Sequence, residues 1–287
     1  MTILVSTPNG NVGRHIVAAL RDRPDVRYLV RSAGSAAALG PVRGEVAIGD
    51  AADGADARRV AVGVTRLYLA HPFAEDQVRA EWTLASAALA AGASRIVKLG
   101  ARAFTGPGIV PDAVTGAHDI VAARLREAGV PELTVLRPDR FLQNFLTSRH
   151  TIAGGSLPDP AGSGVRGFVD VRDIAEVAVA ELTAERPVGG EIEVSGPREL
   201  HLREVAAAFA AAVGRPVRYL DVPLDERWRT RLVASGASEF IIDGLSGLYR
   251  NYRAERASGL GDGVRRVLGR EPRSVDVFAT EVLAPAR

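Results

Sequence analysis

Two glycines, three residues apart, stand between a short apolar run and the start of a helical pattern. The apolar run is Ile3–Val5, and the glycines are Gly10 and Gly13 in the stretch STPNGNVG. In a strand–turn–helix unit, glycines let the backbone approach a phosphate, and the N–H groups and dipole of the helix attract its negative charge. We therefore expect this turn to hold the pyrophosphate of a dinucleotide.

The turn departs from the all-glycine version at its first positions. Thr7 and Pro8 stand where the first glycine is usual. Proline donates no N–H and threonine disfavours positive φ, so we expect a turn that cannot copy the all-glycine shape. Asparagines in the turn tolerate left-handed backbone and add amide donors. The residues expected to bind here are Thr7, Asn9, Gly10, Asn11, Val12 and Gly13.

Residues at the ends of the next two strands indicate which dinucleotide binds. Arg31 and Ser32 follow the second strand, where the adenosine ribose would lie, and an arginine there suits a 2′-phosphate. Asp50 ends the third strand and could reach the adenine. We therefore expect NADP(H) rather than NAD(H). The alternative is that Arg31 is an ordinary solvated residue.

Several residues could serve the nicotinamide end of such a site. His118 can donate a proton near neutral pH, and a helix N-terminus would tend to keep it neutral. Lys98, the only lysine, ends the fifth strand at the edge where open α/β sheets bind ligands. The other residues expected along the nicotinamide path are Ala70, His71, Pro72 and Pro138. Each has a structural alternative: a surface histidine, a lysine paired with a carboxylate, or a loop held by proline.

Short apolar runs alternate with helical patterns through the first two-thirds of the chain, which is typical of a parallel sheet with crossover helices. The expected strands are Thr2–Ser6, Val26–Val30, Glu45–Ile48, Arg66–Leu69, Arg95–Leu99, Leu133–Arg137 and Glu191–Val194. The expected helices include one on which Val12, Ile16 and Leu20 form a stripe, and Glu81–Ala91, Ala117–Ala128 and Arg203–Val213.

The pattern changes after about residue 150. The Pro158–Gly167 stretch reads as loop, and FVDVRDIAEVAVAEL reads as a short strand entering a helix capped by Asp170 or Asp173. The fold class expected is a doubly wound parallel α/β sheet (Rossmann) with a smaller, mainly helical C-terminal substrate region. We assign residues 1–150, completed by 166–196, to the NADP-binding core, and residues 151–165 and 197–287 to the substrate-binding region.

Composition excludes several classes of protein. The 287 residues are 47% hydrophobic and 24% charged with a net charge of +2, too small to favour nucleic acid or an anionic membrane as partner. The absence of cysteine excludes disulfides and thiolate chemistry. The five histidines lack the spacing of a metal site, and no apolar stretch is long enough to span a membrane. We expect a cytoplasmic protein without a metal, as a monomer or homodimer.

Together these motifs resemble the NmrA-like group of atypical short-chain dehydrogenases/reductases. The usual TGATGxxG opening of that group aligns with STPNGNVG, and its VLRP-x-x-F-x-Q-N-F phrase is present at Val135–Phe145. The segments Phe168–Ala175 and Val264–Ala279 are also similar to that group. The resemblance implies a Rossmann core, a smaller C-terminal substrate region and NADP(H) binding. Some members reduce quinones, aromatic ketones or related molecules, and others are redox sensors.

The usual acid of short-chain reductases is missing. They use a Tyr-x-x-x-Lys pair in which the ammonium lowers the pKa of the phenol. The corresponding helix here is TGAHDIVAARLREAG, with His118 in the likely place of the tyrosine and Ala122 four residues later. We name His118 and Lys98 as candidate catalytic residues. Water or a hydroxyl of the substrate could also supply the proton, because hydride transfer belongs mainly to the cofactor.

Aromatic residues suggest the kind of substrate. Large apolar residues recur at near-helical spacing in the C-terminal part of the chain, a pattern typical of either core or the wall of an apolar pocket. They are Trp228, Phe240, Leu245, Leu248, Tyr249 and Tyr252. The residues expected to contact substrate are Phe73, Phe104, Phe141, Trp228 and Tyr249. The loop Thr105–Thr115 could act as a mobile lid.

The leading hypothesis is an NADP(H)-dependent oxidoreductase that transfers hydride to a small apolar or aromatic ketone, quinone or enone. Two alternatives stay open: an NADP(H)-binding redox-sensing regulator without catalysis, and an epimerase or isomerase that retains its cofactor.

Overall fold

Seven parallel strands form one sheet in the order β3-β2-β1-β4-β5-β6-β9. The computed structural model describes residues 1–255 and 259–283. The strands are β1 (Ile3–Val5), β2 (Val26–Val30), β3 (Glu45–Ile48), β4 (Arg66–Leu69), β5 (Arg95–Leu99), β6 (Glu132–Pro138) and β9 (Gly190–Val194). The strand order reverses between β1 and β4, which places a crevice at their carboxyl ends. The predicted fold class is confirmed, and all seven predicted strands form.

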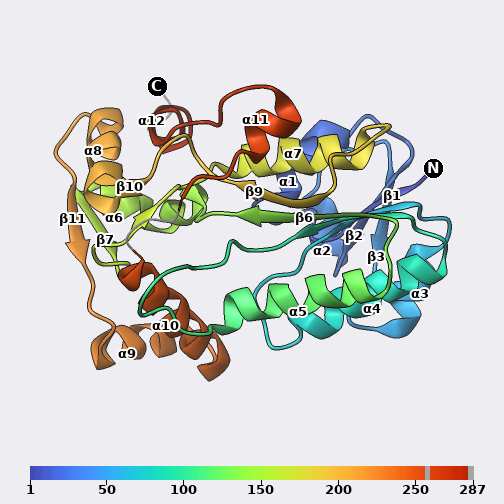
Figure 1. Cartoon of the computed structure of the whole chain (residues 1–287), viewed down its shortest axis with the longest axis horizontal. Coiled ribbons are helices and arrows are strands. Elements are labelled where there is room, and N and C mark those ends of the chain that lie inside the picture. Colours follow the sequence, from blue (N-terminus) through green and yellow to red (C-terminus); the bar gives the residue numbers. More distant parts are fainter. Residues whose placement is uncertain (256–258, 284–287) are drawn as a thin grey trace.

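Helices cover both faces of this sheet (Figure 1). One layer holds α1 (Gly13–Leu20), α7 (Val171–Thr183) and α11 (Gly263–Leu268), and the other holds α3 (Gly54–Ala61), α4 (Gln77–Ala90) and α5 (Ala113–Glu127). The short helix α2 (Ala33–Ala37) follows β2. Ile16 and Leu20 of the predicted stripe on α1 are buried with the sheet residues Val5 and Val30. Because both faces are covered, the strands are apolar at successive positions.

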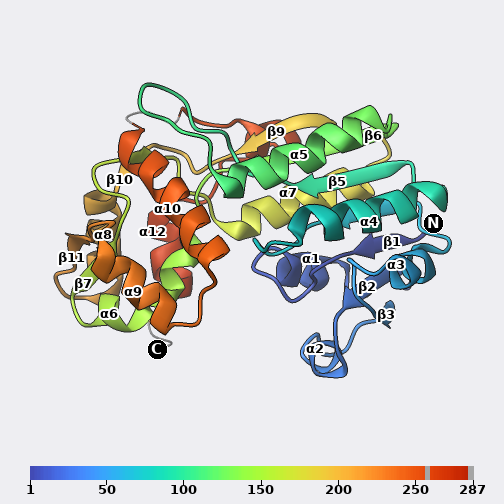
Figure 2. The same cartoon turned by 90° about the horizontal axis from the view of Figure 1, so that it is seen from below.

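The remaining elements lie beyond the carboxyl ends of the strands (Figure 2). The helical ones are a 3-10 helix (Leu142–Ser148), α6 (Arg149–Ala153), α8 (Leu202–Val213), α9 (Glu226–Ala234), α10 (Glu239–Ala254), α12 (Val275–Phe278) and a π-helical turn (Ala279–Leu283). Two small sheets pair β7 (Ser156–Asp159) with β11 (Arg218–Asp221) and β8 (Val165–Arg166) with β10 (Leu200–His201). The assignment of this region to substrate binding stays a prediction.

These two small sheets contradict the sequence prediction of a loop at Pro158–Gly167. The strands are short, and one of them contains Pro158, so local β-propensity is weak and pairing with distant residues decides the conformation. The strand predicted at the start of FVDVRD is also wrong. Only Val169 pairs there, in a single bridge to Phe141.

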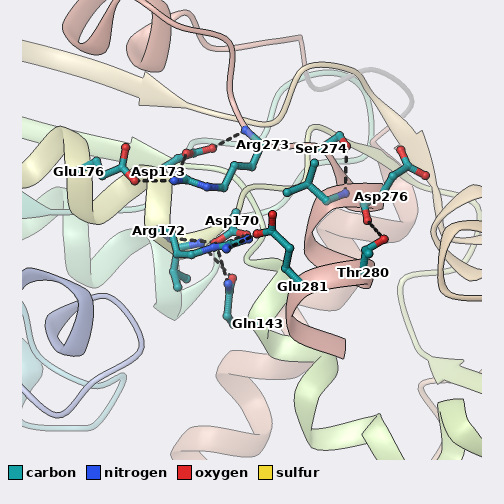
Figure 3. A network of polar contacts seen from close by, with 12 residues as sticks. Gln143, Asp170, Arg172, Asp173, Glu176, Arg273, Ser274, Asp276, Thr280 and Glu281 are labelled. Carbon is teal, nitrogen blue, oxygen red and sulfur yellow. Dashed lines mark hydrogen bonds and ion pairs between the residues drawn. The ribbon is translucent and has the colours of Figure 1, made fainter. Parts of the chain in front are cut away.

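A polar network joins the end of the chain to α7 (Figure 3). Asp170 caps α7 as predicted, because its carboxylate accepts a hydrogen bond from the backbone N–H of Arg172. Asp173, the other predicted cap, is instead buried and forms ion pairs with Arg270 and Arg273. The network therefore anchors the segment after α11 to the helix that packs on α1. In the described residues, no helix is both long and apolar enough to cross a membrane.

Candidate functional site

The turn after β1 adopts left-handed backbone at Thr7, whose φ is 46°. Thr7 is the one non-glycine residue with positive φ in the described part of the chain. Thr7 therefore adopts the positive φ that we expected it to disfavour. The hydroxyl of Thr7 donates a hydrogen bond to the carbonyl of Ala70 at 3.3 Å, which ties the turn to the end of β4.

The two glycines of the turn allow its backbone to fold back on itself. A Cβ at Gly13 would lie 2.1 Å from the carbonyl oxygen of Thr7, and one at Gly10 would lie 3.2 Å from the same atom. The backbone N–H groups of Val12 and Gly13 donate to no acceptor among residues 1–255 and 259–283, and both residues line a cavity described below. N–H groups without an internal partner at the start of a helix bind anions. The turn therefore fits a pyrophosphate.

Two adjoining cavities run along the carboxyl edge of the sheet. Their volumes are about 270 and 470 Å³. Both are lined by Thr7, Gly10, Ala70, His71 and Pro72, so they form one continuous cleft with the turn at its middle. The two cavities offer separate places for the two halves of a dinucleotide, as expected at a topological switch point.

The smaller cavity contains the residues predicted for the adenosine half. Arg31 and Asp50 line it, and Arg31 forms no ion pair with a described residue. Asn9 also lines it and donates through its side-chain amide to the carbonyl of Ser35 at 2.7 Å. Ser32 does not line the cavity but caps α2. Sequence reasoning missed Ser35, although its place in the RSAGS segment next to Arg31 was a usable signal.

The larger cavity extends from the turn to α10. Its lining includes eight residues that the sequence predicted for the site: Asn11, Val12, Gly13, Phe73, Phe104, His118, Pro138 and Phe141. Trp228 and Tyr249 do not line it; their rings pack edge to face with centroids 6.2 Å apart. Residues that the sequence did not indicate as cavity lining include Tyr68, Arg102 and Arg166. The cavity is also lined by Asn144, Leu248 and Tyr252. Leu248 and Tyr252 belonged to the aromatic stripe, so only part of that stripe is pocket wall.

The arginines of the larger cavity are paired with carboxylates. Arg166 forms ion pairs with Asp139, at 2.7 Å, and with Glu255. Arg102 lies 3.4 Å from Asp139 and 3.2 Å from Glu193. In the same way, Arg140 is buried against Asp159 and under four aromatic rings, those of Phe145, Phe168, Tyr249 and Tyr252. This end of the cleft therefore carries no excess of positive charge.

His118 and Lys98 are brought together by α5 and β5. The Nζ of Lys98 lies 3.0 Å from Nδ1 of His118, and the side-chain amide nitrogen of Gln77 lies 3.1 Å from the same atom. Lys98 is fully buried and does not line the cleft. The structure therefore places Lys98 behind His118 rather than against a bound cofactor. Glu81 of α4 pairs with Lys98 at 3.1 Å, and sequence reasoning identified neither Glu81 nor Gln77.

The surroundings of His118 favour its neutral form. Burial, followed by the positive charges of Lys98 and Arg137, holds the pKa of His118 well below its ordinary value. For the ion pair behind it, burial raises the pKa of Glu81 and lowers the pKa of Lys98, and their mutual attraction opposes both shifts. A neutral imidazole can still donate one N–H to a ligand in the cleft.

The segment predicted as a lid is attached to α10. Asn251, fully buried on α10, accepts from the N–H of Val110 at 2.9 Å and donates to its carbonyl at 2.8 Å. The same amide donates to Asp112 at 3.0 Å, and Asp112 caps the helix that carries His118. Movement of this loop is therefore coupled to α10, which also forms a wall of the cleft. Lid motion itself stays a prediction.

Comparison with known proteins gives a consistent result. The model of the NmrA-like family matches residues 1–244. The chain is 31% identical over 282 residues to an NAD(P)H azoreductase of Xenophilus azovorans, covering 96% of each chain. It is 34% identical over 238 residues to a (4-alkanoyl-5-oxo-2,5-dihydrofuran-3-yl)methyl phosphate reductase of Streptomyces griseus, covering 81% of this chain and 80% of that one. An NADPH-dependent quinone oxidoreductase of Escherichia coli crystallised with NADPH has the same fold, with a TM-score of 0.80 at 18% identity, covering 98% of this chain and 99% of that one.

Proposed function

The chain belongs to the NmrA-like family, and from this membership and the geometry of the cleft we propose that it is an NADPH-dependent reductase of small, uncharged aromatic acceptors. One observation carries the proposal. A single cleft joins a turn with unsatisfied N–H groups to a histidine fixed by Lys98 and Gln77. The first feature suits a dinucleotide, and the second suits proton donation to a reducible group.

The residues of the turn and the two cavities would hold the cofactor. Val12 and Gly13 would donate to its pyrophosphate, and Arg31 would contact the 2′-phosphate that distinguishes NADPH from NADH. The azoreductase relative uses NAD(P)H, which supports a nicotinamide cofactor. When bound, NADPH supplies hydride. The protein's own contribution is to orient the acceptor, to exclude water and to hold a proton on His118.

The substrate class follows from the charges at the far end of the cleft. Because Arg102, Arg140 and Arg166 are paired with carboxylates, an anionic group placed there would meet no uncompensated positive charge. This argues against a phosphate ester like the substrate of the Streptomyces griseus relative. The aromatic rings of Phe73, Phe104 and Phe141 instead suit a flat apolar compound. Quinones, aromatic ketones, enones and uncharged azo compounds fit this description.

The test combines binding with turnover. Calorimetry should show that the purified protein binds NADPH, and the loss of NADPH absorbance should report turnover of at least one uncharged quinone, aromatic ketone, enone or azo compound. A matched pair of azo compounds, with and without a sulfonate, tests the charge argument, since the uncharged one should react faster. Tight NADPH binding without turnover of any acceptor would contradict the proposal and favour a redox-sensing regulator. Absence of NADPH binding would contradict both.

A further inference from the structure

Three groups that can accept a proton or a hydrogen bond surround the amino group of Lys98. Its ammonium forms an ion pair with Glu81 at 3.1 Å, donates to the carbonyl of Leu99 and lies 3.0 Å from Nδ1 of His118. An ammonium has no lone pair, so a charged Lys98 can only donate to Nδ1 of His118. The attraction of the buried carboxylate of Glu81 favours charged Lys98 and opposes the effect of burial on its pKa.

The same arrangement decides which nitrogen of His118 carries the proton. Nδ1 faces two donors, the ammonium of Lys98 and the side-chain amide of Gln77. A nitrogen that accepts hydrogen bonds carries no proton in the neutral ring, so the hydrogen is on Nε2. Lys98 and Gln77 are buried and lie outside the cleft, whereas His118 lines it. Nε2–H is therefore the ring donor that remains for a ligand.

We propose that Lys98 and His118 form a proton relay, in which Lys98 holds the proton of His118 on Nε2 and supplies a new proton to Nδ1 when the first one leaves. This inference rests on the reductase function proposed above. Glu81 is a positioning residue in this relay, because it keeps the ammonium of Lys98 in place through an ion pair.

The proton movements balance. As the acceptor gains hydride from the reduced nicotinamide, the Nε2–H bond of His118 breaks and its proton goes to the heteroatom of the acceptor. One N–H bond of Lys98 breaks at the same time, and that proton goes to Nδ1. Lys98 becomes a neutral amine and His118 remains neutral, so no imidazolate forms. The positive charge lost from Lys98 is gained by the oxidised nicotinamide, and water returns a proton to the site after the product leaves.

The first test reads the tautomer of His118 without any reaction. Long-range ¹H–¹⁵N NMR spectra of the ligand-free protein, assigned with a His118→Gln variant, should show a protonated Nε2 and an unprotonated Nδ1. A Lys98→Met variant would leave Glu81 buried without a partner, so the variant to use is Lys98→Met combined with Glu81→Gln, with NADPH calorimetry as a check of folding. It should show a mixture of tautomers. Protonated Nδ1 in the wild-type protein, or an unchanged tautomer in the double variant, would overturn the proposal.

The second test determines how many protons move in the rate-limiting step. Single-turnover rates with the best acceptor are measured in mixtures of H₂O and D₂O. In the wild-type protein, the plot of rate against the fraction of D₂O should be curved because two protons move together. The double variant should be about tenfold slower or more, and its plot of rate against the fraction of D₂O should be linear because one proton moves. A linear plot for the wild-type protein would overturn the relay even if the acceptor is reduced. If no acceptor is reduced, the proposed function fails and the relay with it, while the NMR result still reports separately whether Lys98 fixes the tautomer.

Discussion

The carbonyl oxygen of Thr7 occupies the place where a side chain of residue 13 would begin. A Cβ on Gly13 would lie 2.1 Å from that oxygen and 2.9 Å from two backbone atoms of Pro8. Backbone atoms cannot move aside as the end of a flexible side chain can. The left-handed conformation of Thr7 and the absence of a side chain at position 13 are therefore two parts of one turn.

This relationship predicts that Gly13→Ala abolishes NADPH binding. The added methyl group must displace the turn or the start of α1, and either shift moves the N–H groups that we expect to meet the pyrophosphate. Calorimetric titration with NADPH measures the effect. Gly116→Ala is the matched control, because a Cβ at Gly116 on α5 would meet no atom within 4 Å. Binding by Gly13→Ala equal to that of the control would contradict our account of the turn.

Arg31→Ala should weaken binding of NADPH much more than binding of NADH. Arg31 lines the smaller cavity without an ion pair to a described residue, so its charge is available to a 2′-phosphate. Loss of a charge-assisted contact costs about 1–3 kcal/mol. Dissociation constants of the two dinucleotides give the difference, and Arg43→Ala provides an exposed arginine outside the cavity for comparison. Equal weakening of both dinucleotides would remove the assignment of Arg31.

His118→Ala should slow reduction by about 10²-fold or more while leaving NADPH affinity nearly unchanged. The reason is that Lys98 and Gln77 hold the ring of His118 at the cleft through Nδ1, whereas the turn that we expect to bind the pyrophosphate lies between β1 and α1. Single-turnover rates and calorimetry separate the two effects. An unchanged rate would mean that water or the substrate donates the proton.

The sheet and the approximate place of the cleft were predictable because they depend on local patterns. Each strand of the sheet is a compact apolar run, and the carboxyl ends of parallel strands meet at one edge. Thr7, His71 and His118 were recognised from their places after strands or at a helix start, and all three line the cleft. Two-residue strands such as β8 and β10 carry no such pattern and form only through pairing across the fold.

Relations between distant side chains were not predictable in the same way. Lys98 was placed correctly at the end of its strand, but nothing in the spacing showed that it would lie under α4 against Glu81. Trp228 and Leu248 have similar helical spacing, yet Leu248 lines the cleft and Trp228 packs against Tyr249. Periodicity identifies an apolar face but does not tell whether a neighbouring helix or a cavity covers it.

Asn251→Leu should loosen the loop before α5 and raise KM more than it lowers kcat. The substitution removes the partners of the Val110 backbone and of Asp112. A buried polar group such as Asp112 costs about 1–3 kcal/mol when a partner is lost. Hydrogen exchange at residues 105–112, together with steady-state kinetics, measures the two effects. Asn144→Leu is a useful comparison, since Asn144 is an exposed asparagine that lines the larger cavity and, in the described part of the chain, forms no hydrogen bond with this loop. Unchanged exchange in Asn251→Leu would show that other contacts hold the loop.

The low pKa of His118 predicts how the free energy of unfolding depends on pH. Burial and the charges of Lys98 and Arg137 keep the ring neutral in the folded protein, whereas the unfolded chain takes up a proton near the ordinary pKa of 6.5. Between the folded pKa and 6.5 the unfolded state binds more protons, so stability rises with pH and is lost as the pH falls. The contribution of one group is at most about 1.4 kcal/mol per pH unit.

His118→Gln should reduce this slope, because glutamine does not titrate. Urea unfolding from about pH 7.5 to about pH 5 measures the slope in each protein. His150→Gln, which removes an exposed histidine of α6, is the matched control for the loss of one imidazole. The difference between the variants should grow below pH 6.5, where the folded protein alone resists protonation of residue 118. Identical slopes for His118→Gln and the wild type would show that His118 titrates alike in both states, and would remove the argument that it acts as a neutral donor.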